Sequence, residues 1–212
     1  MTRTETPWGP WEPATPQEVA RLFAPLSLLT PRVPWWIAGG YAIELAVGRS
    51  LREHGDVDVL LLRPDQLAAQ RVLDGWDLWA ADPPGTLRPW LRGEILPPSV
   101  HDIWCRPTPS SPWRIQLMLD SADGADWVSR RSPASGVIRR PVSSIGSVSP
   151  DGIAFLAPEI QLFYKAQSPR PKDEQDFAFA LPHLSPGQRR WLADALAAAY
   201  GPHPWSARLM GQ

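Results

Sequence analysis

The sequence predicts an α+β protein in which strands come first and helices come last. Strand-like apolar runs dominate the first two-thirds of the chain, and helical patterns fill the last third. Two capping boxes, Thr15-Pro16-Gln17-Glu18 and Ser185-Pro186-Gly187-Gln188, each mark the start of a helix. We therefore expect an irregular N-terminal arm (1–14), a strand-rich domain (15–150) and a small helical C-terminal domain (151–212).

Strands are expected where short apolar runs lie between turn residues. The predicted strands are Trp35–Ala38, Val57–Leu62, Trp76–Ala80, His101–Arg106 and Trp113–Leu119, with a hairpin of Trp127–Arg131 and Val137–Arg140 around Pro133-Ala134-Ser135-Gly136. Helices are expected from the first capping box, over Tyr41–Val47 before Gly48, over Pro64–Leu73, and over 158–167, 171–180 and 186–200. Trp8 and Trp11 are the residues that would hold the N-terminal arm against this core.

Composition excludes several classes of protein. The net charge of −1 gives no basic field for nucleic acid, so a nucleic-acid partner is not expected. No apolar run approaches the roughly 20 residues that span a membrane, and the N-terminus lacks the apolar core of a signal peptide. The single cysteine, Cys105, excludes an internal disulfide and fits a small buried residue in a reducing compartment. We therefore expect a cytoplasmic protein without a membrane partner.

Two carboxylates, Asp56 and Asp58, lie at the start of a predicted apolar strand, in the stretch Arg52-Glu53-His54-Gly55-Asp56-Val57-Asp58. Side chains two residues apart on a strand point to the same face, so Asp56 and Asp58 repel each other unless a cation lies between them. Mg²⁺ binds through one or two carboxylates together with substrate phosphates. The pair is therefore a candidate magnesium site, although a lone Asp-x-Asp is more often a solvated strand end.

Gly39-Gly40 lies upstream, between a predicted strand and a predicted helix. Glycines at such a junction let the backbone approach a phosphate, and the N-terminus of the helix favours anions. Alone, the two glycines would indicate only a tight turn. A phosphate cradle beside a magnesium ligand pair, however, is typical of phosphoryl or nucleotidyl transfer.

These motifs resemble those of the polymerase-β-type nucleotidyltransferase superfamily, and more closely those of the enzymes that adenylylate aminoglycoside and lincosamide antibiotics. The resemblance extends over most of the chain from about residue 20. It is carried by 38–44, 52–59, 156–166 and 170–177, which read AGGYAIE, REHGDVDV, LAPEIQLFYKA and RPKDEQDF.

The resemblance implies a mixed-sheet catalytic domain, a helical C-terminal domain, and Mg²⁺-dependent transfer of AMP from ATP to a hydroxyl of a small molecule, an antibiotic among the candidates. Asp56 and Asp58 match the metal-binding pair of the family, and Gly39 and Gly40 match its phosphate-contacting turn. Lys165 and Lys172 fall in the block that faces the nucleotide.

The basic residues carry alternative interpretations. Lys165 and Lys172 are the only lysines, and a lysine suits phosphate as a compact point charge, but both could also be helix-end cations near Asp173 and Glu174. His54 could touch phosphate or orient a carboxylate of the Asp pair, or form a purely structural hydrogen bond. Arg130 and Arg131 could reach phosphates from the hairpin, although basic pairs are common on protein surfaces.

A third carboxylate on a neighbouring strand is usual in the superfamily, as a metal ligand or as the base. On Trp113–Leu119 the mid-strand polar residue is Gln116, which cannot act as a base, and Asp120 lies at the strand end. Either Asp120 takes the catalytic role, or Gln116 faces the site. The second case favours a nucleotidyltransferase-like protein that has lost or changed the reaction and binds a nucleotide or metabolite. A third hypothesis is an enzyme acting on protein or RNA.

Overall fold

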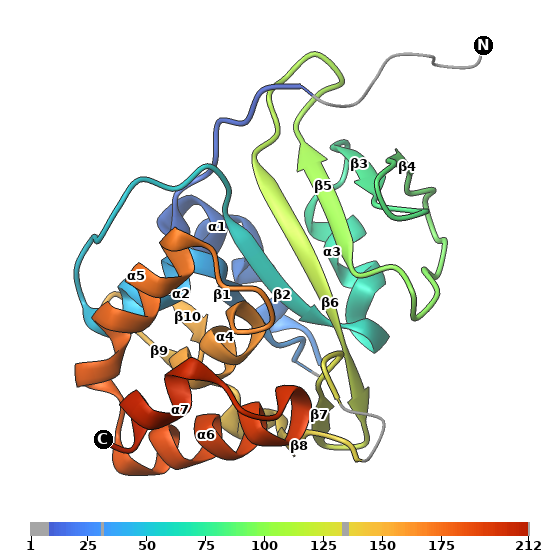
Figure 1. Cartoon of the computed structure of the whole chain (residues 1–212). Helices are drawn as coiled ribbons and strands as arrows, with labels where there is room; N and C mark the ends of the chain where they lie inside the picture. Colours follow the sequence, from blue (N-terminus) through green and yellow to red (C-terminus); the bar gives the residue numbers. More distant parts are fainter. Residues whose placement is uncertain (1–8, 31, 133–135, 212) are drawn as a thin grey trace.

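The protein is a mixed β-sheet covered by helices, with its C-terminal helices gathered at one side (Figure 1). The computed structural model describes residues 9–30, 32–132 and 136–211. The strands are β1 (Trp35–Ala38), β2 (Asp58–Leu62), β3 (Asp77–Ala80), β4 (Arg88–Pro89), β5 (Asp102–Arg106), β6 (Ile115–Asp123), β7 (Asp126–Val128), β8 (Arg139–Pro141), β9 (Gly146–Val148) and β10 (Ala154–Leu156). The helices are α1 (Pro16–Phe23), α2 (Gly39–Val47), α3 (Gln66–Val72), α4 (Pro158–Lys165), α5 (Pro171–Ala180), α6 (Pro186–Tyr200) and α7 (Pro204–Leu209).

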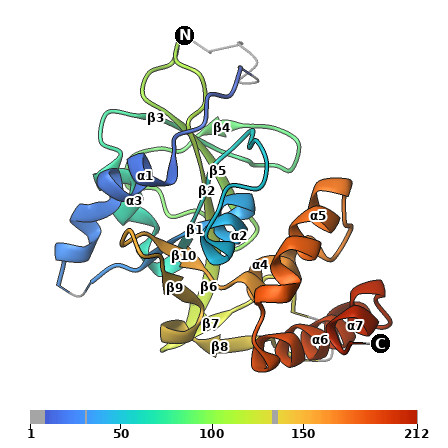
Figure 2. The same ribbon diagram turned by 90° about the vertical axis from the view of Figure 1, so that its left-hand side faces the viewer.

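The strands follow the order β4-β3-β5-β6-β2-β1-β10-β9, and β7 joins β6 to β8. The pairs β2–β6 and β1–β10 are parallel, whereas the other neighbours are antiparallel. Seen edge-on, α1 and α3 lie on one side of the strands and α4 to α7 on the other (Figure 2). The predicted α+β class is therefore confirmed, with the mixed sheet that the family resemblance implied.

The central strands are apolar because they are covered on both faces. All four residues of β1 are buried, and so are Val59 to Leu62 of β2. Continuous apolar runs of this kind are typical of strands with helices on both sides of the sheet. The core that they form continues into α4, where Ile160, Leu162 and Phe163 are fully buried.

Several predicted elements agree closely with the structure. Both capping boxes are formed, at Thr15 and at Ser185, and the helices 171–180 and 186–200 have the predicted bounds. Gly48 ends α2 with φ of 81°, in the left-handed region that favours glycine. The hairpin prediction is reproduced by the pairing of β7 with β8, although Pro133-Ala134-Ser135 lies outside the described residues.

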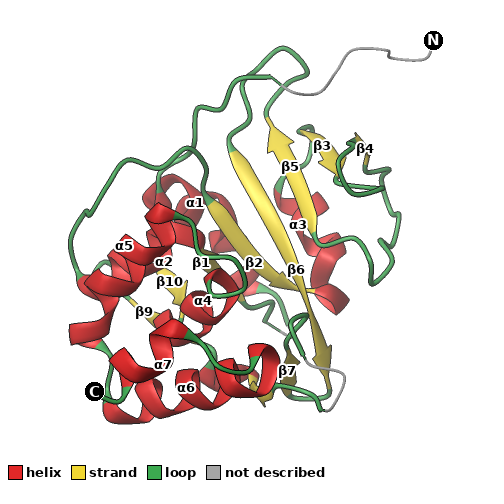
Figure 3. Cartoon of the chain, viewed as in Figure 1, coloured by secondary structure: helices red, strands yellow, loops and turns green. Residues whose placement is uncertain are grey.

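Other elements were not predicted, chiefly the short strands β4, β9 and β10 and the helix α7. β10 lies inside the segment predicted as helical, and it pairs with β1 and β9 (Figure 3). The predicted domain limit at residue 150 thus falls between two paired strands of one sheet. In the N-terminal arm, Trp11 packs on Trp104 and Trp113 as expected, whereas Trp8 lies outside the described residues.

Of the helices within the described ranges, none combines the length and the apolar character that crossing a membrane requires.

Candidate active site

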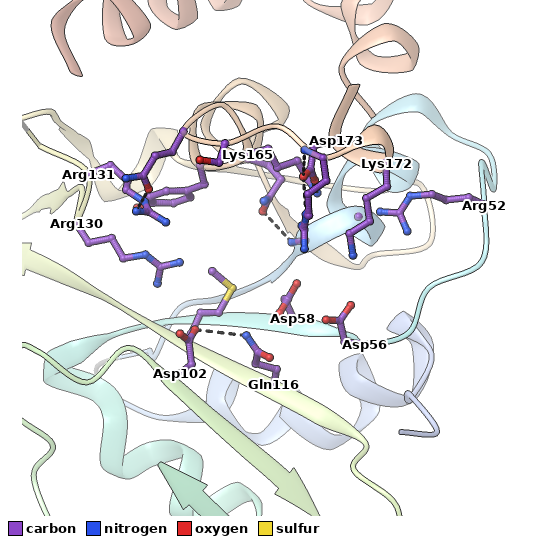
Figure 4. Close-up of a pocket in the computed structure, with 18 residues that line it drawn as sticks. Arg52, Asp56, Asp58, Asp102, Gln116, Arg130, Arg131, Lys165, Lys172 and Asp173 are labelled. Atoms are coloured by element: carbon purple, nitrogen blue, oxygen red, sulfur yellow. Dashed lines mark hydrogen bonds and ion pairs between the residues drawn. The ribbon is translucent and has the colours of Figure 1, made fainter. Parts of the chain in front are cut away.

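A cleft of about 460 Å³ lies between the sheet and the segment that joins α4 to α5 (Figure 4). This volume is within the range of sites that hold small molecules and cofactors. From the sheet, β2, β5 and β6 contribute Asp58, Asp102 and Gln116, and the opposite wall is formed by residues 161–173. The acids Asp58 and Asp102 thus come from the sheet, and Lys165, Arg170 and Lys172 come from the opposite wall.

Asp56 and Asp58 both line this cleft, as the spacing on the strand predicted. Burial raises the pKa of Asp58 to about 7, and the negative charges of Asp56 and Asp102 add to the effect; Lys165 and Arg130 partly offset it. An acid with so high a pKa holds its negative charge at a cost in free energy. A cation bound here would remove that cost.

Gly39 has to be glycine because of this carboxylate. Its φ of 66° is unfavourable for other residues, and a Cβ at this position would lie 2.1 Å from Asp58 Oδ2. The Gly39 amide donates a hydrogen bond of 2.8 Å to Gln161 Oε1. The start of α2 is thus packed directly against the candidate metal site, with one of its free N–H groups already satisfied by α4.

Gly40 also lines the cleft, but its small size has a structural reason as well. A Cβ here would lie 2.3 Å from His54 Cε1 and 2.4 Å from Arg52 Nη2. A larger residue at position 40 would therefore displace these side chains whether or not a phosphate is bound.

The third acid of the cleft is Asp102, which was not predicted. It is the first residue of β5 and is paired with Met118 of β6. Gln116 Nε2 donates a hydrogen bond of 3.4 Å to Asp102 Oδ1. Asp102, Trp104 and Arg106 alternate with the buried Ile103 and Cys105 along β5, so they share one face, but the sequence does not show that this strand lies beside β6.

The prediction that Asp120 is the catalytic third acid is not supported by its position. Asp120 is opposite Leu62, whereas Gln116 is opposite Asp58. Four residues at about 3.3 Å each separate the two places by about 13 Å along the sheet. Asp120 is fully buried, does not line the cleft, and accepts hydrogen bonds of 2.7 Å from Trp127 Nε1 and from Tyr164 OH.

His54 is also misplaced for the nucleotide contact predicted for it. Its Nε2 lies 2.8 Å from Glu44 Oε1, its ring packs on Tyr41 with centroids 4.1 Å apart, and its side chain is 3% exposed. Glu44 also accepts hydrogen bonds from the amides of Leu51 and Arg52. His54 thus contributes to fastening the 49–57 loop to α2, and the structural alternative describes it better.

Lys165 lines the cleft but is engaged by two carboxylates of α5. Its Nζ lies 2.9 Å from Asp173 Oδ1 and 2.9 Å from Asp176 Oδ2, and its side chain is 8% exposed. Burial would raise the pKa of Asp173, but hydrogen bonds from Arg170 and Lys165 outweigh it, so the pKa lies well below its usual range. Lys165 is therefore an ion-pair centre that joins α4 to α5 at the edge of the cleft.

Lys172 is placed differently. It lines the cleft beside Arg170, and its side chain points toward Asp56 and Asp58 (Figure 4). Among the described residues, none forms an ion pair with it. Of the two lysines, Lys172 is the one available to a phosphate.

The carboxylates suit a magnesium ion that is shared with a substrate. In the part of the chain that the structure describes, no group of three or more His, Cys, Asp or Glu side chains is arranged to hold a metal by itself. Asp56 and Asp58 would supply two oxygen ligands, and phosphate oxygens and water would complete the shell, as is usual for Mg²⁺. Asp102 lines the same cleft, but we do not count it among the candidate metal ligands.

Comparison with known proteins agrees with this description. Residues 22–75 match the family model of aminoglycoside-2''-adenylyltransferases. No curated protein sequence matches the chain. The crystal structure of the lincosamide antibiotic adenylyltransferase LnuA, lincomycin-bound, aligns with a TM-score of 0.53 and 15% identity, over 79% of this chain and 97% of LnuA.

A solution structure of the antibiotic-resistance factor ANT(2'')-Ia aligns with a TM-score of 0.54 and 15% identity, over 87% of this chain and 92% of that protein. At these identities the alignments show a shared fold. The resemblance is confirmed in sequence to the aminoglycoside-2''-adenylyltransferase family over residues 22–75, and in fold to the lincosamide and aminoglycoside enzymes over most of the chain.

Proposed function

We propose that this nucleotidyltransferase-like chain is an enzyme that moves a nucleoside monophosphate, AMP, from ATP to a hydroxyl of a small molecule, with Mg²⁺ as cofactor. The observation that carries the proposal is that three carboxylates line one cleft, those of Asp56, Asp58 and Asp102. Lys172 and the start of α2 line the same cleft. Three carboxylates in one cleft, two of which raise the pKa of the third, are costly unless a cation and a reaction make use of them.

The triphosphate would lie between the start of α2 and the 165–173 segment. Lys172 and Arg170 would contact its phosphates, and Gly39 and Gly40 would allow its close approach. Asp56 and Asp58 would hold Mg²⁺, which supplies charge neutralisation and orientation of the phosphates when bound. Asp173 and Asp176 would fix the position of Lys165 at the edge of the site through their ion pairs with its Nζ.

The transfer forms a bond between the acceptor oxygen and the α-phosphorus and breaks the bond from the α-phosphorus to the bridging oxygen, which leaves with pyrophosphate. The proton of the acceptor hydroxyl has to go to a base within hydrogen-bond reach. We assign this role to the carboxylate of Asp102, which Gln116 orients through its hydrogen bond. Gln116 then has a positioning role, and its lack of acidity does not prevent the reaction.

The acceptor proposed from the resemblance is a small hydroxylated molecule of the antibiotic class. LnuA is described as a lincosamide antibiotic adenylyltransferase with lincomycin bound. The net charge of −1 gives no overall basic field that would favour a nucleic-acid acceptor. We place the reaction in the cytoplasm, because the single cysteine, Cys105, is free and buried and fits a reducing compartment.

The direct test is pyrophosphate release with each nucleoside triphosphate against a panel of small hydroxylated molecules. We expect release that requires Mg²⁺, is fastest with ATP, and falls by about 10²-fold or more in Asp56→Asn. Absence of triphosphate binding by calorimetry would contradict the proposal. Tight binding of the triphosphate without turnover of any acceptor would favour the alternative, a protein of this fold that binds a nucleotide and has lost the reaction.

A further inference from the structure

The cations of the cleft fall into two sets at opposite ends. Lys172 and Arg52 lie near Gly40 and Asp56, whereas Arg130 and Arg131 lie on the far side of Asp58 (Figure 4). Arg130 of the second set is close to Asp120, which is four residues from the Asp58 position along the paired strands. At about 3.3 Å per residue, the two ends are on the order of 10 Å apart. The triphosphate proposed above occupies the first end only.

Arg130 has hydrogen-bonding capacity that the protein does not use. Its Nη1 lies 3.7 Å from Asp120 Oδ1, which is an ion pair without a hydrogen bond, and this nitrogen has no hydrogen-bond acceptor. The guanidinium lies over the ring of Tyr164, 4.9 Å from the centroid, and the Arg130 side chain is only 14% exposed. Among the described residues, none accepts a hydrogen bond from its five N–H donors.

Asp120 and Tyr164 hold this guanidinium in place without saturating it. Tyr164 OH and Trp127 Nε1 both donate to Asp120 Oδ2, so the carboxylate itself is fixed. The negative charges of Asp120, Asp102 and Asp58 lie close enough to favour the charged form of Arg130. A charged, oriented and unsaturated guanidinium at the wall of a cleft is suited to bind a carboxylate or a phosphate in two parallel hydrogen bonds.

Arg131 adds a second positive charge at this end. Its Nη1 donates a hydrogen bond to Gln167 Oε1, and its buried Nε has no acceptor. Both arginines line the cleft next to Asp102, the proposed base.

The unused donors at this end of the cleft decide which acceptor fits. Six cationic side chains and four carboxylates line the cleft. Asp120 pairs with Arg130, and Asp176 pairs with Arg52 and Lys165, so the formal charge of the whole cluster is zero. If Mg²⁺ engages Asp56 and Asp58, and the triphosphate engages the cations around Lys172, then Arg130 faces the acceptor with guanidinium N–H donors that no described residue uses. An anionic group on the acceptor would accept these hydrogen bonds, whereas a cationic group could not.

We propose that the acceptor carries an anionic group, a carboxylate or a phosphate, and that Arg130 binds this group with Asp120 and Tyr164 as positioning residues. The inference rests on the proposed function and specifies its acceptor. Asp120 is too far from Asp56 and Asp58 to act as the base. In this proposal its role is to position Arg130.

The first test measures binding of inorganic phosphate to protein that already holds Mg²⁺ and a non-hydrolysable ATP analogue, so that the triphosphate end is filled. Wild type is expected to bind phosphate, and Arg130→Gln to weaken that binding at least tenfold. Arg92→Gln is the matched control, because Arg92 is 87% exposed and paired with Asp74 outside this cleft. It should bind phosphate as wild type does.

Arg130→Gln leaves Asp120 without its counter-charge and can lower stability. Two further variants avoid this problem. Arg130→Lys keeps the charge and loses the fork of the guanidinium, and the double variant Asp120→Asn/Arg130→Gln removes both charges together. Both should fold, and both should bind phosphate more weakly than wild type. Unchanged phosphate binding in the folded double variant would overturn the inference.

The second test compares turnover within matched acceptor pairs: a hydroxy acid with its amide, a sugar phosphate with the free sugar, and an aminoglycoside as the cationic case. The kcat/KM of the better anionic acceptor should be at least tenfold higher than that of its neutral partner. Which anionic acceptor is better, the hydroxy acid or the sugar phosphate, identifies the group as a carboxylate or a phosphate. In Arg130→Lys the KM for the better anionic acceptor should rise about tenfold or more, while the KM for ATP changes less than twofold.

The outcomes separate the two proposals. Turnover of the aminoglycoside or of the neutral members at full rate in wild type, unaffected by Arg130→Lys, would contradict the anionic acceptor and leave the nucleotidyltransferase activity standing. A loss of ATP affinity in Arg130→Lys with unchanged acceptor KM would assign Arg130 to the triphosphate and also overturn the inference. Failure of wild type to bind the ATP analogue with Mg²⁺ would refute the proposed function itself.

Discussion

Gln116 of β6 lies directly opposite Asp58 of β2, in the place where a neighbouring strand was expected to carry a third carboxylate. The carboxylate of this face comes instead from β5, one strand further from β2, where Asp102 accepts a hydrogen bond of 3.4 Å from Gln116. The Gln116 amide therefore lies between the candidate metal pair and the acid that we assign as base.

Asp102→Asn tests this assignment. We expect turnover to fall by roughly 10²- to 10⁴-fold, the range for loss of a general base, because an amide cannot accept the proton of the hydroxyl. The affinity for ATP with Mg²⁺ should change little, since Asp102 is not assigned as a ligand. Asp120→Asn is the comparison variant. It should raise the KM for the acceptor and lower stability, but it should reduce kcat less than Asp102→Asn does. The reverse ranking of the two kcat values would restore Asp120 as the base.

The pH dependence of stability tests the environment of Asp58 without any substrate. Its pKa is raised from 3.8 to about 7 in the folded protein, mainly by burial and by Asp56 and Asp102. The folded state therefore binds the proton more tightly than the unfolded state, and this residue costs stability increasingly as the pH rises from about 4 to about 7.

Asp58→Asn removes that cost. In the absence of metal, the variant should melt at a higher temperature than wild type at pH 7.5, and the two melting curves should converge as the pH falls toward 4. A variant that melts lower than wild type at pH 7.5 would show that Asp58 already has a favourable partner in the free protein.

Gly39→Ala tests why the start of α2 carries a glycine. The added Cβ would meet the Asp58 carboxylate, whereas Gly48→Ala, at a similar positive φ of 81°, would meet nothing within 4 Å. Both changes should cost about 1–2 kcal/mol in the free energy of unfolding from the left-handed backbone, and Gly39→Ala should cost more than Gly48→Ala because its Cβ displaces the Asp58 carboxylate. Only Gly39→Ala should also weaken ATP binding with Mg²⁺, by at least tenfold in calorimetry. Equal binding by the two variants would reduce Gly39 to a turn residue.

Asp173→Asn tests the ion-pair centre that joins α4 and α5. Asp173 is buried and accepts hydrogen bonds from Lys165 Nζ and from Arg170, so its loss should cost about 3 kcal/mol at pH 7. Because its pKa is lowered from 3.8, this stabilisation is present above pH 4 and is lost as the pH falls further. The difference in urea unfolding free energy between wild type and variant should therefore shrink below pH 4.

The control for this prediction is Asp74→Asn. Asp74 forms an exposed ion pair with Arg92, with side chains 66% and 87% exposed, and such pairs contribute about 0–1 kcal/mol. A loss in Asp173→Asn no larger than that in Asp74→Asn would mean that the α4–α5 centre does not stabilise the fold.

The parts of the fold that local rules control could be predicted from the sequence. The capping box at Ser185 fixes the start of α6 because the bonds that form it lie within four residues. The spacing of Asp56 and Asp58 likewise implied that both carboxylates point to one site, and both line the cleft, although Asp56 precedes β2. By contrast, β10 contains only three residues and depends on β1 and β9 for its hydrogen bonds. Nothing local distinguishes such a segment from a loop.

The composition of the site could be predicted only where its residues adjoin in sequence. Asp102 and Asp58 come together because β5, β6 and β2 are neighbours, and strand order is set by packing over the whole domain. His54 was assigned to the nucleotide because it stands next to the Asp pair in the chain. Its partner, Glu44, is on α2, and His54 packs behind Gly40 without lining the cleft itself.

The central claim is that Asp56 and Asp58 bind a magnesium ion together with a triphosphate. The measurement that tests it most directly is a calorimetric titration of a non-hydrolysable ATP analogue into wild type and into Asp58→Asn, with and without Mg²⁺. We expect wild type to bind at least tenfold more tightly with Mg²⁺ than without it, and Asp58→Asn to lose that gain while remaining folded. Equal affinity of the two proteins in the presence of Mg²⁺ would contradict the claim.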